Sequence, residues 1–136
     1  MAPQQAARTS KHLTVVEAPA ALAEAPDVDI ALGTLRRLRG GWRPAEGLLT
    51  DALPADRWSV AREADAPVYQ FIGARHFPLS RSFTVATVLA LDPAEGWALL
   101  FGGGWVRLGE PAAGMAPFDA ADVQRRAERW LLSFDE

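Results

Sequence analysis

The stretch SFTVATVLALDPAEGWALLFGGGWVRLG, residues 82–109, decides the fold of this chain. Residues 83–91 have apolar side chains on both faces of an extended chain, small on one face, which predicts an interior strand. The segment DPAEG at 92–96 is a turn sequence, since proline suits its second position and glycine tolerates positive φ. Residues 97–101 return as a strand, three glycines break the ladder at 102–104, and residues 105–108 continue as a bulged or a separate strand. We therefore predict a central β-hairpin.

Two further strands are predicted before this hairpin. Residues 58–63 (WSVARE) alternate, and residues 68–72 (VYQFI) form a second extended run that ends at Gly73, so the pair reads as a hairpin. Residues 74–81 are expected to be a loop, because Pro78 cannot donate a hydrogen bond inside a sheet. A short edge strand is predicted at 13–17 (LTVVE), whose residues are rich in branched side chains.

Two helices are predicted on either side of the strands. Asp27 is the expected N-cap of the first, whose apolar side chains recur at helical spacing and which ends at Gly40-Gly41. A single helical turn is expected after Pro44, in a loop that Pro54 and Asp56 close. The expected apolar face of this first helix comprises Val28, Ala31, Leu32, Leu35 and Leu38.

The second helix begins after Asp119, a good N-cap, with Asp122 in the position of an acidic capping box and Phe118 placed to staple onto Val123. Its expected apolar face comprises Val123, Ala127, Trp130, Leu131 and Phe134. Together these elements predict an α+β fold, an antiparallel sheet of about four strands packed against two main helices. We predict that residues 1–12 are a disordered tail and that 13–136 form a single domain.

The composition excludes several classes of protein. The 136 residues contain no cysteine, so disulfides, thiol catalysis and cysteine zinc sites are ruled out. No run of about 18 apolar residues is present, so no membrane partner is expected, and the first residues lack a signal-peptide core. The net charge of −3 gives no global attraction to nucleic acid. A cytoplasmic location is the expectation.

The candidates for catalysis are weak. The two histidines are His12, in the predicted tail, and His76, in the predicted loop beside Ser80 and Arg81. No acid accompanies His76 at a known spacing, and GxSxG and HExxH are absent. The three glycines lack the lysine and serine of a phosphate-binding loop and are read as a bulge. We predict no enzyme, no catalytic or metal-binding residue and no cofactor.

Two sets of residues are candidate binding surfaces. Trp97 and Trp105 flank the glycines with Arg107 two residues on, and an exposed tryptophan there would mark a protein-binding site. The second set is a basic edge without an intervening acid, which would give salt-dependent nucleic-acid binding. It comprises Arg36, Arg37, Arg39 and Arg43.

The central hairpin also carries a family resemblance. Asp92-Pro93, Gly96-Trp97 and an aromatic residue before Arg107-Leu108-Gly109 resemble a family of short bacterial proteins known only as a domain of unknown function. The similarity covers residues 32–109, including the Gly40-Gly41 helix end before Pro44 and Leu53-Pro54 leading to Trp58. The glycines at 102–104 and the C-terminal helix depart from the pattern. The resemblance implies a bacterial, cytoplasmic accessory protein and brings no activity or site residues.

The first hypothesis is a non-enzymatic protein that binds and regulates another protein, for example a phage- or plasmid-encoded inhibitor of host machinery. The alternative is a nucleic-acid-associated protein that uses the basic edge from Arg36 to Arg43. A third is a small-ligand pocket or enzyme beside His76 and the glycines. A homo-oligomer is also open, because only Arg107 guards the edge of residues 105–108.

Overall fold

The computed structural model describes residues 13–17, 26–77, 80–102 and 104–135, so the predicted tail at 1–12 lies outside the described residues. The main helices are α1 (Pro26–Arg39) and α3 (Ala120–Leu132). The short helix α2 (Glu46–Thr50) follows α1, and a 3₁₀ turn, η3 (Ser133–Asp135), follows α3. The strands are β1 (Leu13–Glu17), β2 (Leu53–Ala61), β3 (Gln70–Phe77), β4 (Ser80–Asp92), β5 (Trp97–Leu100) and β6 (Gly104–Leu108). The predicted α+β class with two main helices is confirmed, and the described sheet has six strands rather than about four.

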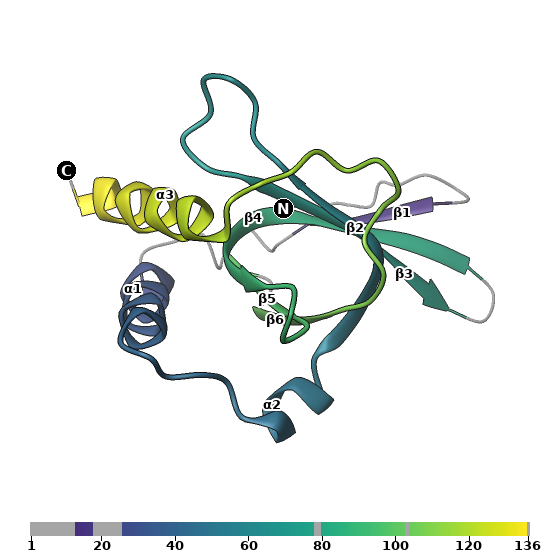
Figure 1. Cartoon of the computed structure of the whole chain (residues 1–136), viewed down its shortest axis with the longest axis horizontal. Helices are drawn as coiled ribbons and strands as arrows, with labels where there is room; N and C mark the ends of the chain where they lie inside the picture. The colour runs from purple at the N-terminus through teal and green to yellow at the C-terminus, as the bar shows by residue number, and fades with distance from the viewer. Residues whose placement is uncertain (1–12, 18–25, 78–79, 103, 136) are drawn as a thin grey trace.

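Five of these strands close into a ring. The sheet order is β1-β4-β3-β2-β6-β5, and β4 also pairs with β5. Successive strands from β2 to β6 run antiparallel, and β2 and β6 close the ring in parallel. An odd number of alternating strands requires one such parallel pair. β1 adds to the outside of β4 in parallel, on the side away from the helices (Figure 1).

The long strand β4 takes part in both halves of the sheet. Its first part pairs with β1 and β3, and its last part, from Val88 to Asp92, pairs with β5. The register of the β4–β5 pairing shifts between Val88 and Ala90. Val88 and Leu91 belong to one core cluster, whereas Leu89 and Ala90 belong to the other. The bulge therefore turns the strand and exchanges its faces, which a strictly alternating pattern does not predict.

The two core clusters lie inside and outside the ring. Along β5, Ala98 and Leu100 belong to the inner cluster and Trp97 and Leu99 to the outer one, and every residue of the strand is buried. The outer cluster is covered by α1 and α3, which lie together on one side of the molecule (Figure 1). Each large apolar side chain buried in this way contributes about 1.5–3 kcal/mol. The two-sided burial predicted for residues 83–91 is confirmed for 88–91, all of which are buried, whereas Phe83, Val85 and Thr87 are half-buried.

Several predicted boundaries are wrong. β2 begins at Leu53, so Pro54 and Asp56 lie in a strand and do not close a loop. Pro54 pairs only with β6, because pairing with β3 starts at Asp56, and its missing N–H is therefore not needed by a second neighbour. The predicted loop at 74–81 is largely the hairpin of β3 and β4, although residues 78–79 lie outside the described part.

The two main helices follow their sequence signals closely. α1 starts at Pro26, which suits a first helical position, so Asp27 is its second residue and not its cap. Gly41 has φ of +105° directly after α1, as expected of a helix stop. Asp119 caps α3, since its carboxylate accepts a hydrogen bond from the Ala121 amide at 3.0 Å. The predicted inward face of α3 is confirmed for Val123, Ala127 and Leu131, whereas Phe134 is 41% exposed.

Candidate functional site

The two candidate tryptophans differ in exposure. Trp97 is only 4% exposed and belongs to the outer core, so it is not available as a surface contact. Trp105 is half-buried, and its ring centroid lies 5.5 Å from that of Trp97 and 6.1 Å from that of Trp42. Its indole is therefore held rigidly among aromatic rings and has limited rotamer freedom.

Arg107 is exposed but serves the fold. Its guanidinium donates a hydrogen bond to the Thr50 carbonyl at 3.0 Å and lies 3.5 Å from the Leu49 carbonyl. These carbonyls belong to the last turn of α2, where a cation stabilises the negative end of the helix. Arg107 thus fastens α2 to β6.

The four arginines of the basic edge differ in their contacts within the chain. Arg39 forms an ion pair with Glu128 of α3, and Arg43 donates to the carbonyls of Leu38 and Trp42 at 2.9 and 2.7 Å. Within the described residues, no carboxylate lies within 4.0 Å of Arg36 or Arg37. Arg39 and Arg43 therefore have polar partners within the described chain, and Arg37 stacks on Trp42, with its guanidinium carbon 4.7 Å from the ring centroid.

The remaining two sequence candidates lie in different parts of the sheet. His76 is in β3, where its backbone pairs with that of Arg81 in β4, so it is not a loop residue. Gly102 and Gly104 have φ of +80° and +75° in the turn from β5 to β6. Because β5 and β6 are separate antiparallel strands, the chain reverses at this turn, and the predicted bulge is wrong. The histidine and the glycines are thus on separate hairpins.

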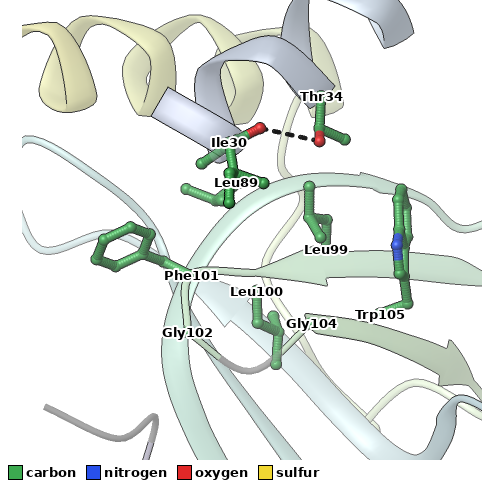
Figure 2. A pocket seen from close by; sticks show the side chains of 10 residues that line it. Ile30, Thr34, Leu89, Leu99, Leu100, Phe101, Gly102, Gly104 and Trp105 are labelled. Atoms are coloured by element: carbon green, nitrogen blue, oxygen red, sulfur yellow. Dashed lines mark hydrogen bonds between the residues drawn. The ribbon is translucent and has the colours of Figure 1, made fainter. Parts of the chain in front are cut away.

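An apolar pocket lies beside this glycine turn, between α1 and the β5–β6 hairpin (Figure 2). Its volume is about 260 Å³. Phe101 and Trp105 stand at its opposite ends, and Ile30 and Thr34 reach over it from α1 (Figure 2). The described residues that line it are Ile30, Ala31, Thr34, Leu89, Leu99, Leu100, Phe101, Gly102, Gly104 and Trp105. We call this site the α1–hairpin pocket.

The rim of the α1–hairpin pocket is unusually apolar for a protein surface. Ile30 is 67% exposed, more than any other large hydrophobic residue among those described. The side-chain hydroxyl of Thr34 donates to the Ile30 carbonyl at 3.0 Å (Figure 2). Among the described residues that line the pocket, Thr34 is the one with a hydroxyl group and none has a titratable side chain. The described lining is therefore suited to hold an apolar group.

The sequence did not identify Ile30, Thr34 or Phe101 as site residues. One signal was present, because Ile30 lies off the apolar stripe of α1 that runs through Val28, Ala31 and Leu35. A large aliphatic residue outside the buried face of a helix is exposed unless another element covers it. The pocket itself depends on how α1 is placed over the hairpin, which no local pattern specifies.

A polar cluster joins α3 to the β2–β3 hairpin. The Tyr69 hydroxyl and the Arg126 guanidinium each donate to Asp122 Oδ2 at 2.9 Å, and Arg125 donates to Oδ1. Hydrogen bonds from Arg126 and Tyr69 lower the pKa of Asp122 to about 2, while the bond to Asp122 raises the pKa of Tyr69. Asp122 is therefore engaged as a structural anion by its neighbours and does not act as the predicted capping-box partner of Asp119.

The described part of the chain has neither a metal-binding cluster nor a membrane-spanning helix. No group of three or more histidine, aspartate or glutamate side chains is arranged there to hold a metal ion. None of the helices described combines the length and apolar character needed to cross a bilayer.

No protein-family model matches the chain, and neither the curated proteins nor the solved structures contain a significant match.

Proposed function

We propose that this protein is a non-enzymatic regulatory protein that binds another protein by docking an apolar segment of it in the α1–hairpin pocket. The observation that carries the proposal is the open apolar pocket beside Ile30, a side chain that is 67% exposed. Exposed apolar surface of this kind, next to a concave site, is characteristic of interaction surfaces.

The energetics favour a covered state of this surface. Burying an isoleucine completely is worth about 1.5–3 kcal/mol, so covering the exposed part of Ile30 contributes about 1–2 kcal/mol. Trp105 adds a large, rigid indole at one end of the pocket, and tryptophan is enriched among residues that dominate binding energy. The anchoring side chain of a partner would therefore meet a preformed site.

The chemistry of the lining supports binding more than catalysis. Catalysis needs a group that transfers a proton, attacks the substrate or stabilises a developing charge. The described residues of the lining offer apolar side chains, two glycines and a threonine hydroxyl that is bonded to a backbone carbonyl. The alternative, nucleic-acid association through the basic edge, stays a prediction; Arg39 and Arg43 already have partners within the chain.

Site-specific photo-crosslinking tests the proposal. A photoreactive residue placed at Ile30 in the full chain, expressed in its native cells, should crosslink to a partner protein. The matched control places the same residue at Glu63, which is exposed in the loop between β2 and β3 and does not line the pocket. Crosslinking from both positions alike, or from neither, would contradict docking at the pocket.

A further inference from the structure

We propose that the segment docked in the α1–hairpin pocket carries one large apolar side chain and a carboxylate within about two residues of it, which Arg37 binds. This inference rests on the proposed function and specifies its partner. The occupant is thus an acidic, apolar segment of another protein.

The size of the pocket indicates a single side chain. A cavity of about 150 Å³ lined by Leu, Ile and Phe holds one benzene ring, and pockets for drug-sized ligands and cofactors start at about 300 Å³. The α1–hairpin pocket, at about 260 Å³, lies between these values. It therefore fits one aromatic or branched aliphatic side chain and is too small for most cofactors.

The position of Arg37 adds a charge at one end of the pocket. Arg37 follows Thr34 by three residues on α1, a rise of about 4.5 Å along the same side of the helix. Its guanidinium carbon lies 4.7 Å from the ring centroid of Trp42, which in turn packs against Trp105. Arg37 thus lies close to the Trp105 end of the pocket, where Thr34 also stands (Figure 2).

Arg37 is also the right kind of cation for a carboxylate. No carboxylate lies within 4.0 Å of it among the described residues, so none of them satisfies its forked donors with an ion pair. Stacking on Trp42 restricts the side chain, so less rotamer entropy is lost when a partner binds. A planar guanidinium held in this way can bind a carboxylate with two parallel hydrogen bonds.

The position of Arg37 sets the side of the anchor on which the acid lies. Ile30, Thr34 and Arg37 follow one another at spacings of four and three residues on α1, so they share one side of the helix. An acidic group of the partner is therefore attracted at the Arg37 end of the pocket. In an extended segment, successive residues advance about 3.3 Å. A carboxylate one or two residues from the anchor is therefore displaced from it by about 3–7 Å, which matches the rise of about 4.5 Å from Thr34 to Arg37.

The test is a selection of random linear peptides displayed on phage against the full-length protein. Sequences enriched on the wild type are expected to share an aromatic or large aliphatic residue with Asp or Glu within about two positions. Arg37→Gln should keep the apolar anchor but lose the acidic preference. Arg36→Gln is the matched control, since it removes the same charge one residue away and should leave the preference unchanged.

Affinities of one enriched peptide then measure the contact. Arg37→Gln should weaken binding by about two- to five-fold, the range of an exposed ion pair, when followed by fluorescence polarisation. The same peptide with its acid replaced by the amide should bind wild type and Arg37→Gln equally. Raising the salt concentration from about 0.1 M to about 1 M should reduce the difference, because the ion pair is screened.

The outcomes separate the two proposals. Apolar anchors without an acidic preference, or equal effects of Arg36→Gln and Arg37→Gln, would overturn the acidic partner and leave the proposed function standing. No enrichment on the wild type, or binding unchanged by Ile30→Glu, would overturn the proposed function itself. Dimers in analytical ultracentrifugation that Ile30→Glu dissociates would show that a second copy is the occupant, which also overturns this inference.

Discussion

Gly73→Ala tests the closed packing of the strand ring. Gly73 lies in β3, and a methyl group on its Cα would lie 2.8 Å from the Cβ of Ala55 in β2 and 2.9 Å from Cε2 of Phe71. Both neighbours are nearly inaccessible, with Ala55 2% exposed and Phe71 fully buried. Phe71 also stacks on Trp58, with ring centroids 6.4 Å apart and planes at 12°. The Phe71 side chain cannot move away from the added methyl group without disturbing its stacking on Trp58.

The expected cost follows from this crowding. Added methyl groups in a well-packed core destabilise by about 1–3 kcal/mol. For a domain of this size, a loss of about 2 kcal/mol lowers Tm by roughly 6–10 °C. Urea unfolding followed by tryptophan fluorescence and by far-ultraviolet circular dichroism measures the free energy of unfolding. The slope with urea should stay unchanged, because the surface exposed on unfolding is nearly the same.

Gly33→Ala is the matched control for Gly73→Ala. Gly33 lies within α1, and a methyl group there meets no heavy atom within 4 Å. Alanine is a better helix former, so this variant should gain about 0.5–1 kcal/mol. Adding Ala55→Gly to Gly73→Ala should recover part of the loss and give a favourable coupling free energy. A Gly73→Ala protein as stable as wild type to within about 0.5 kcal/mol would refute the close approach of β2 and β3.

Three further predictions address other parts of the molecule. Trp97→Ala should destabilise by about 3–5 kcal/mol in urea unfolding, because Trp97 is a core residue; an effect below about 1 kcal/mol would contradict its burial. The pKa of Asp122 is lowered to about 2 in the folded protein, so the stabilisation by its carboxylate is complete above the unfolded pKa and is lost as pH falls from about 4 towards 2. The Tm of Asp122→Asn, measured by thermal unfolding, should lack this part of the pH dependence, and the same pH profile in wild type and variant would contradict the role of Asp122. For nucleic-acid association, duplex DNA should bind at about 0.1 M salt and lose affinity when Arg36 and Arg37 are both replaced by glutamate; the absence of low-salt binding by the wild type would remove that alternative.

The proposed role of the pocket gives the glycines at the β5–β6 turn a second function. Gly102 and Gly104 adopt positive φ, which the turn requires, and they also line the pocket without filling it. A side chain at either position would be strained and would project from the same short turn. The sequence predicted that the strand is broken at these glycines, but not that the chain reverses there or that the turn lies beside a concave surface.

Local sequence signals determined the secondary structure where each residue acts on its own neighbours. Asp119 caps α3 and Gly41 follows the end of α1, as expected, because capping and positive φ are properties of a few adjacent residues. The turn at 92–96 is likewise formed, with the Gly96 amide bonded to the Asp92 carbonyl at 2.8 Å and Gly96 at φ of +82°.

Only the tertiary structure decided how these elements close and what they expose. Gly73 was expected to end a strand, yet it lies inside β3, and the space that its missing side chain leaves is taken up in part by Ala55 of β2, which is distant in the sequence. Trp97 and Trp105 stand in equivalent local contexts, and the helices above the sheet bury the first and leave the second half-exposed. Ring closure and helix placement depend on contacts between distant residues, and no local pattern contains that information.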